Sequence, residues 1–134
     1  MSRDRRCPCH SRKRYRRCCE PLHQGRPAPT PLALMRSRFA AYALGDVDYI
    51  MATTHPDGPH YQADARAWAE SLAAFSAGTR FKGLRILEHI DGEEEGWVTF
   101  RAELTQSGQD ASFTERSLFG KADGRWAYRD GEPS

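Results

Sequence analysis

Apolar residues in the first half of the chain recur at spacings of three and four, which is typical of helices with one buried face. The first such stripe consists of Leu32, Met35, Phe39 and Tyr42. Thr30-Pro31 supplies an N-cap hydroxyl followed by a proline suited to the first turn, and Gly45 can end the helix. The pattern therefore predicts a helix between Thr30 and Gly45.

Two further helices are predicted before Gly78. Asp46 can cap a short helix that His55-Pro56 would end. A longer one runs from about Asp64 to Ala77. Its apolar stripe consists of Trp68, Leu72 and Phe75.

After Gly78 the apolar residues alternate with polar ones, as in strands with one buried face. The predicted strands are Thr79–Ile90, Trp97–Gln106, Ala111–Lys121 and Arg125–Arg129. Asp91-Gly92, Ser107-Gly108 and Asp123-Gly124 lie between them and are typical of hairpin turns. Helices followed by consecutive antiparallel strands predict an α+β fold, in which about three N-terminal helices pack on a curved four-stranded antiparallel sheet.

The composition limits the class of protein. The 134 residues are 39% hydrophobic and 28% charged, which suits one folded domain with a short appendage. No stretch approaches the roughly 18–20 apolar residues that cross a bilayer, and the N-terminus lacks the apolar core of a signal peptide. We therefore expect a cytoplasmic protein with no membrane partner.

The net charge of +2 hides a basic head on an acidic body. Residues 1–19 contain 8 of the 20 Lys and Arg and one acid, a charge of +7, whereas the remainder contains 12 bases against 17 acids, a charge of −5. A candidate surface for a partner in the head consists of Arg12, Lys13, Arg14, Arg16 and Arg17.

All four cysteines lie in this head, as Cys7, Cys9, Cys18 and Cys19. Disulfides between them would close only short loops, and a bridge between the adjacent Cys18 and Cys19 would be strained. Four thiolates instead match the closed tetrahedral shell of a structural zinc ion, and the surrounding cations would favour the thiolate forms. A redox-sensing thiol cluster and a metal-free head are the alternatives, and His10 or His23 could replace one sulfur.

The run from Cys7 to Cys19, CPCHSRKRYRRCC, resembles the SEC-C motif, a small zinc-binding knuckle. His10 and Arg12 stand where that family usually has glycine. If those glycines serve a turn with positive φ, His10 tolerates the conformation more readily than Arg12. Residues 1–20 are thus predicted to be a zinc knuckle, 21–31 a proline-rich linker without a regular element, and 32–134 the α+β domain.

The α+β part carries segments that resemble the uncharacterised YchJ-like bacterial family. They are MRSRF at 35–39, DVDYI at 46–50, THP at 54–56, TERSLF at 114–119 and RWAYRDG at 125–131. The resemblance implies a fold like that of nuclear transport factor 2 (NTF2), a cone of bent sheet closed by helices. By the same resemblance, a homodimer is plausible.

Polar and aromatic residues of the domain form a candidate site. They are Arg36, Arg38, Tyr42, His55, Trp68, Glu115, Arg116, Trp126, Tyr128 and Asp130. One interpretation is structural: Arg36 or Arg38 pairs with Glu115 or Asp130 and ties the first helix to the last hairpin. The other is a ligand cavity walled by the aromatic residues. His55 and Glu115 could in principle act as a base and its partner, but His55-Pro56 is also a common helix boundary and no catalytic motif supports catalysis.

Two functions remain open from the sequence. The first is a non-enzymatic zinc-binding adaptor whose basic head contacts an acidic protein or ribosomal RNA, with DNA as a weaker alternative. The second is a small-molecule-binding or enzymatic domain in which the zinc knuckle is only structural. A cavity with converging polar groups would favour the second, and a filled core would count against it.

Overall fold

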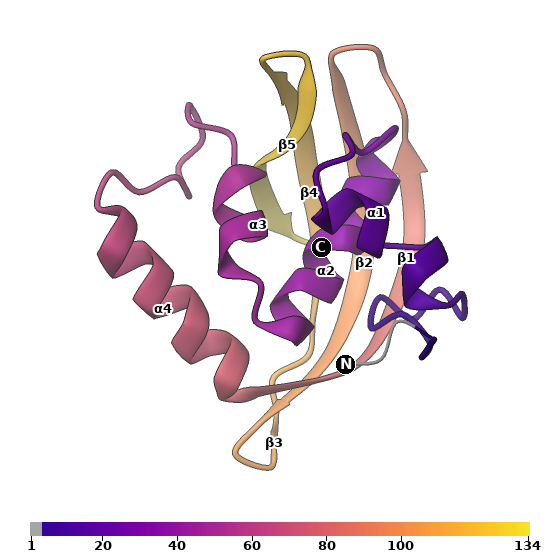
Figure 1. Ribbon diagram of the computed structural model, residues 1–134, viewed down its shortest axis with the longest axis vertical. Helices are drawn as coiled ribbons and strands as arrows, with labels where there is room; N and C mark the ends of the chain where they lie inside the picture. The colour runs from indigo at the N-terminus through magenta and orange to yellow at the C-terminus, as the bar shows by residue number, and fades with distance from the viewer. Residues whose placement is uncertain (1–3) are drawn as a thin grey trace.

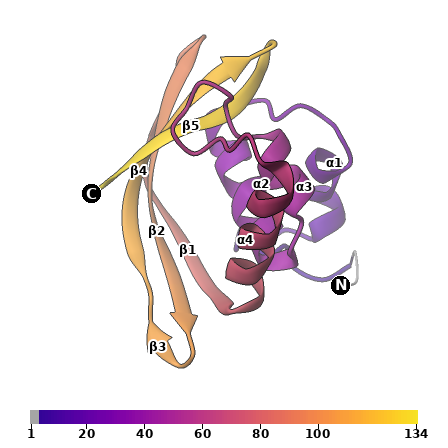
Figure 2. The ribbon, with the colours of Figure 1, turned by 90° about the vertical axis from the view of Figure 1, so that its left-hand side faces the viewer.

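Helices lie on one face of a bent antiparallel sheet in the computed structural model, which describes residues 4–134 (Figure 1, Figure 2). The helical elements are a 3-10 turn at Tyr15–Arg17, α1 at Glu20–His23, α2 at Pro31–Leu44, α3 at Val47–Ala52 and α4 at Ala65–Ala77. The strands are β1 at Thr79–Ile90, β2 at Glu95–Gln106, β3 at Gln109–Asp110, β4 at Phe113–Ala122 and β5 at Arg125–Pro133. The predicted α+β class is confirmed.

The sheet has the order β1-β2-β4-β5, and all of these pairs are antiparallel. Its inner face includes Val98, Phe100, Ala102 and Leu104, the four residues predicted to share one face of β2, and all are buried. Two of the predicted turns have positive φ at both central residues: Ser107-Gly108 and Asp123-Gly124. This is the backbone of a type I′ hairpin turn, which matches the twist of the flanking strands.

Local side chains begin and end the helices as predicted. Thr30 Oγ1 accepts a hydrogen bond from Ala33 N at the start of α2, and Gly45 ends the helix in the left-handed conformation. Asp46 and Asp64 cap α3 and α4 in the same way. The helix α3 ends at Ala52, before the predicted His55-Pro56, because Thr53–His55 pairs with β5 instead: His55 N donates to Tyr128 O at 2.8 Å.

Three elements depart from the sequence prediction. The proline-rich segment contains α1, whose Leu22 is buried, so it is more than an extended linker. A fifth, two-residue strand, β3, pairs with β2 beyond the predicted four. The last strand extends to Pro133 and contains a bulge opposite Leu118 and Phe119. Among residues 4–134, no helix combines the length and the apolar character needed to span a bilayer.

Candidate metal centre and cavity

The four cysteines converge on one point although eight residues separate Cys9 from Cys18. Their Sγ atoms all lie within 4.8 Å of one another, and the pairs Cys9–Cys18 and Cys18–Cys19 are 3.6 and 3.9 Å apart. A tetrahedral site with metal–sulfur bonds of about 2.3 Å has sulfur–sulfur edges of about 3.8 Å. The donor set therefore fits a tetrahedral metal ion with no further shape change than small side-chain movements.

The chain between the cysteines forms a tight loop with two strained residues. His10 and Arg12 have φ values of 61° and 73°, the left-handed region in which side chains are disfavoured. Cys7 N donates to Lys13 O, and Lys13 N donates to Ser11 Oγ. The positive φ that the glycines of the resembled motif would serve is thus present here.

Hydrogen bonds among the thiols divide them into two kinds. Cys19 and Cys7 lower the pKa of Cys18 to about 6, and the Cys18 thiol group in turn lowers the pKa of Cys9. The same contacts with Cys18 raise the pKa of Cys7 and Cys19. The thiol–thiol hydrogen bonds therefore favour the thiolate form at Cys9 and Cys18 and the thiol form at Cys7 and Cys19.

The part of the knuckle that the structure describes packs directly on α2. Ala40, which is fully buried, contacts the cluster formed by Cys7, Cys9 and Cys19. One turn earlier, Arg36 Nη1 donates to Cys9 O at 3.0 Å. The candidate metal centre therefore packs directly against α2, the first helix of the α+β domain.

Neither histidine near the cysteines belongs to the group of side chains that could hold a metal ion. His23 Nε2 donates to Ser37 O at 2.8 Å, so its Nδ1 accepts from the Tyr15 hydroxyl at 2.6 Å. His10 Nε2 donates to Phe81 O at 3.3 Å, and its ring contacts Phe39 edge to face. Both histidines instead fasten the knuckle to the domain.

The basic residues of the head point to solvent. Arg12, Lys13, Arg14, Arg16 and Arg17 are all exposed. Arg14 Nη1 donates to Asp4 O, and Arg16 lies 3.3 Å from the Asp4 carboxylate. A groove of about 700 Å³ separates the knuckle from β1, and its basic lining includes Arg6, Arg12 and Arg85.

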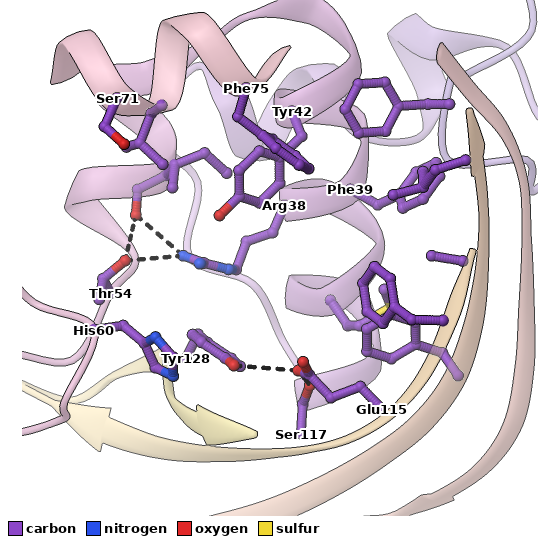
Figure 3. A pocket seen from close by; sticks show the side chains of 18 of the residues that line it. Arg38, Phe39, Tyr42, Thr54, His60, Ser71, Phe75, Glu115, Ser117 and Tyr128 are labelled. Carbon is purple, nitrogen blue, oxygen red and sulfur yellow. Dashed lines mark hydrogen bonds between the residues drawn. The ribbon is translucent and has the colours of Figure 1, made fainter. Parts of the chain in front are cut away.

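A cavity of about 460 Å³ lies between the sheet and the helices α2 and α4 (Figure 3). The α4 stripe Trp68, Leu72 and Phe75 faces this cavity, and Phe75 is 37% exposed. The aromatic part of the lining is Phe39, Tyr42, Trp68, Phe75, Phe81, Phe100, Phe113, Phe119 and Tyr128. The interior of the cone is hollow where periodicity alone would suggest a packed core.

The polar end of the cavity is formed by Arg38 from α2 and by Glu115 from β4. Arg38 is 7% exposed, and its Cζ lies 4.8 Å from the centre of the Tyr128 ring. Glu115 Oε2 accepts from Ser117 Oγ at 2.6 Å and from the Tyr128 hydroxyl at 3.1 Å. Burial lowers the pKa of Arg38, but a guanidinium keeps its proton in proteins.

The mouth of the cavity carries His60, which sequence reasoning missed. Its ring lies 5.3 Å from that of Tyr128, and its Nε2 lies 3.4 Å from Asp130 Oδ1. Because His60 follows no periodic pattern, no signal in the sequence marks it. Ser117 was also missed, although it alternates with Glu115 and Phe119 along β4, so strand periodicity could have found it.

The ion pairs considered in the structural interpretation do not form in the part of the chain that the structure describes. Arg36 contacts Cys9, Arg38 contacts uncharged oxygens, and Asp130 contacts His60. Of the ten candidate residues, those that line the cavity are Arg38, Tyr42, Trp68, Glu115 and Tyr128.

The other candidates lie elsewhere. His55 Nε2 donates to Lys121 O and its Nδ1 accepts from Asp57 N, so backbone groups occupy both ring nitrogens and leave neither for proton transfer. Trp126 belongs to the packed core, where the Lys121 ammonium lies 5.1 Å from its ring. Arg116 lies over the Trp97 ring at 4.2 Å, with Glu132 4.0 Å away.

Comparisons with known proteins agree with this architecture. A family model described as the middle NTF2-like domain of YchJ matches residues 30–131. A UPF0225 protein from Deinococcus radiodurans is 44% identical over 126 residues, which is 92% of this chain and 86% of the relative.

Two solved structures cover nearly the whole chain. The solution structure of a SEC-C motif containing protein from Rhodopseudomonas palustris has a TM-score of 0.81 and 40% identity, covering 97% of this chain and 99% of that one. A crystal structure of a SEC-C motif containing protein from Psychrobacter arcticus has a TM-score of 0.79 at 24% identity, covering 98% and 84%. The second likeness concerns the fold alone.

Proposed function

We propose that the chain, which belongs to the YchJ family with a middle NTF2-like domain, binds a small molecule in its cone and uses the knuckle to hold a structural zinc ion. The observation that carries the proposal is the buried Arg38 guanidinium in a cavity of about 460 Å³. A buried charge that forms no direct ion pair is unfavourable, and a bound polar ligand would accept hydrogen bonds from its free N–H groups. The cavity volume falls in the range of small-molecule sites.

Zinc is the ion that the knuckle suits best. Four thiolates in a tetrahedron form a closed shell, which is the arrangement of structural rather than catalytic zinc. The exposed arginines and lysine around it offset the charge of about −2 that zinc with four thiolates carries. All four cysteines are free thiols, which fits a reducing compartment such as the cytoplasm.

The test of small-molecule binding is a nuclear magnetic resonance titration of the isotope-labelled, zinc-loaded protein with indole as the probe. We expect saturable shifts confined to cavity residues such as Trp68 and Phe75. Ser71→Trp, which adds a ring to the cavity lining, should abolish them. Ala73→Trp on the same helix is the matched control, because Ala73 is exposed and does not line the cavity. Shifts that never saturate, or that survive Ser71→Trp, would contradict the proposal.

A second candidate function is the adaptor that the sequence suggested. It is favoured by the groove of about 700 Å³ between the knuckle and β1, whose lining includes Arg6, Arg12 and Arg85 together with one acid, Glu103. An acidic protein or ribosomal RNA would bind there through salt-sensitive contacts, and DNA remains the weaker alternative.

Binding to purified ribosomes and to an acidic protein, measured across salt concentrations, tests the adaptor. Arg85→Gln should weaken binding and reduce its salt dependence. Arg80→Gln on the same strand lies outside the groove lining and should change neither. The double variant Cys9→Ser, Cys18→Ser should also lose binding. Equal binding by all four proteins would exclude the groove. The predicted homodimer is a separate proposal, which sedimentation of the zinc-loaded protein tests.

A further inference from the structure

The polar end of the cavity presents one hydrogen-bond donor group, Arg38, and one acceptor group, Glu115. Arg38 uses Nη1 for all its hydrogen bonds, to Ile50 O at 3.0 Å, Thr53 Oγ1 at 2.8 Å and Thr54 Oγ1 at 3.3 Å. Its Nε and Nη2 have no hydrogen-bond partner within residues 4–134, although the side chain is almost fully buried. Two nitrogens, which carry three N–H donors between them, are thus available to a ligand.

Glu115 offers the complementary acceptor. Ser117 and Tyr128 both donate to its Oε2, whereas Oε1 accepts no hydrogen bond in the described part of the chain. Burial and the neighbouring Glu115 charge raise the pKa of Tyr128 above its ordinary value, so the phenol stays protonated and donates. This leaves one carboxylate oxygen free for a donor on the ligand.

Tyr128 contacts both charged groups. Figure 3 shows its ring next to the Arg38 guanidinium and its hydroxyl directed at the Glu115 carboxylate, and no nitrogen of Arg38 lies within 4.0 Å of a carboxylate oxygen of Glu115 in the described chain. The two charges sum to zero. A ligand with a net charge would therefore leave one charge without compensation beside the buried Arg38, which is unfavourable.

The aromatic lining of the rest of the cavity favours a ligand with a flat aromatic ring. Aromatic rings of the lining meet edge to face, with centroids 5.6 Å apart for Tyr42–Phe75 and for Phe39–Phe81. Faces and edges of such rings pack well against another flat ring. The apolar wall and the polar end belong to one continuous cavity.

On the basis of the proposed small-molecule function, we infer that the cavity takes an aromatic compound of zero net charge, whose head carries an acceptor for Arg38 beside a donor for Glu115. A primary carboxamide and a zwitterionic α-amino acid share this chemistry. An aromatic carboxylate offers Arg38 an acceptor but gives Glu115 no donor, and an aromatic amine does the reverse. The head group, rather than the ring, should decide affinity.

Five probes with one ring system test this preference. They are indole, indole-3-acetamide, L-tryptophan, indole-3-acetate and tryptamine. Calorimetry on the zinc-loaded protein should show indole-3-acetamide or L-tryptophan binding at least about tenfold more tightly than indole-3-acetate and tryptamine. Whichever of these two probes binds more tightly shows whether the cavity prefers an amide or an amino acid as the head group. Equal affinities for all heads, or tightest binding of a charged head, would overturn the inference.

Charge substitutions should reverse the preference. Glu115→Gln leaves Arg38 uncompensated, so indole-3-acetate should become the tightest probe. Arg38→Met leaves Glu115 uncompensated and should favour tryptamine; if that variant does not fold, Glu115→Gln decides alone. Glu88→Gln, at an exposed position of β1, is the control and should keep the wild-type order. An unchanged order in Glu115→Gln would contradict the assignment of Glu115.

The outcomes separate the two proposals. Saturable binding of indole at cavity residues without any preference among the heads would remove the ligand class and leave small-molecule binding in place. No saturable shift at cavity residues with any of the five probes would remove both. Because a purely structural role of Glu115 predicts equal loss for all probes, an inverted order of affinity identifies it as a ligand contact.

Discussion

His10 and Arg12 show how the backbone conformation of a single residue in a short loop affects the stability of the fold. Both have positive φ, which disfavours a side chain by about 1–2 kcal/mol, while glycine would add about 0.5–1 kcal/mol of chain entropy to lose on folding. The cost of positive φ exceeds the entropy cost of glycine, so glycine at these positions gives the more stable fold. His10 recovers part of it through its contacts with Phe81 O and Phe39, whereas the Arg12 side chain is exposed.

We therefore expect Arg12→Gly to stabilise the zinc-loaded protein by about 0.5–1 kcal/mol, with His10→Gly neutral or destabilising. Urea unfolding at a fixed zinc concentration measures both. The Arg6 Nη1 contact to Arg12 O uses the backbone and survives the substitution. A loss of stability in Arg12→Gly would show that its side chain contributes something beyond the visible contacts.

Gly131 is required by a close approach rather than by its φ. A Cβ at this position would collide with the Glu115 carboxylate and would lie 2.6 Å from the Tyr128 hydroxyl. Gly131→Ala should therefore displace the polar end of the cavity and destabilise the fold by about 1–3 kcal/mol, the usual effect of overpacking. Gly83→Ala is the matched strand control, because its nearest contact would be an ordinary 3.6 Å. Thermal unfolding of both variants measures the effect. Equal changes in melting temperature for Gly131→Ala and Gly83→Ala would contradict this prediction.

Tyr128 gives the protein a predicted sensitivity to alkali. Burial, followed by the Glu115 charge, raises its pKa from 10.0 in the unfolded chain to well above that value in the fold. A raised phenol pKa stabilises the fold below about pH 10 and loses this contribution as the pH rises further. Above pH 10, the free energy of unfolding of Tyr128→Phe should fall less steeply with rising pH than that of the wild type. Removal of the hydrogen bond to Glu115 should nevertheless lower the stability of this variant at neutral pH. Identical alkaline unfolding curves at one zinc concentration would refute this.

At the scale of elements, the sequence predicts whatever depends on neighbouring residues. Thr30 and Gly45 mark α2 because the cap and the left-handed stop are local chemistry, and Ser107-Gly108 marks its hairpin for the same reason. The helix α1 escaped prediction because its stability rests on distant contacts, such as that of His23 with Ser37.

The candidate site was predictable only in its chemistry. Cysteine spacing predicts the candidate metal ligands without a structure, whereas only half of the ten polar and aromatic residues singled out in the domain line the cavity. Which of them converge depends on pairing across the fold: Arg36 reaches the knuckle while Arg38, two residues later, faces the cavity. An apolar stripe such as that of α4 looks the same whether it faces a packed core or a hollow.

The helix α4 should be the least protected regular element around the cavity. Trp68 is its only buried residue, whereas α2 buries eight of its fourteen residues. Exposed helices with few packed side chains open locally at low free energy. We expect amide hydrogens of α4 to exchange more than about tenfold faster than those of α2, with indole slowing α4 selectively. Equal protection of both helices would mean that α4 opens only with the whole domain.

At the scale of the molecule, the four-cysteine cluster and the cavity meet at α2. Ala40 packs on the cysteines, Arg36 donates to Cys9 O, and Arg38 points into the cavity from the same helix. Removal of the metal should therefore affect the cavity although none of the four cysteines lines it. This coupling gives the basic head a structural role in addition to any partner that it contacts.

Chelation of the metal-loaded protein tests that coupling. We expect one zinc ion per chain, a lower melting temperature after its removal, and at least about tenfold weaker binding of whichever indole probe binds the loaded protein most tightly. Native mass spectrometry, thermal unfolding and calorimetry measure these three effects. The double variant Cys9→Ser, Cys18→Ser should behave like the chelated protein and should not respond to chelator. If the melting temperature falls while probe affinity stays constant, the knuckle stabilises the chain without shaping the cavity, because α2 then holds Arg38 in place unaided.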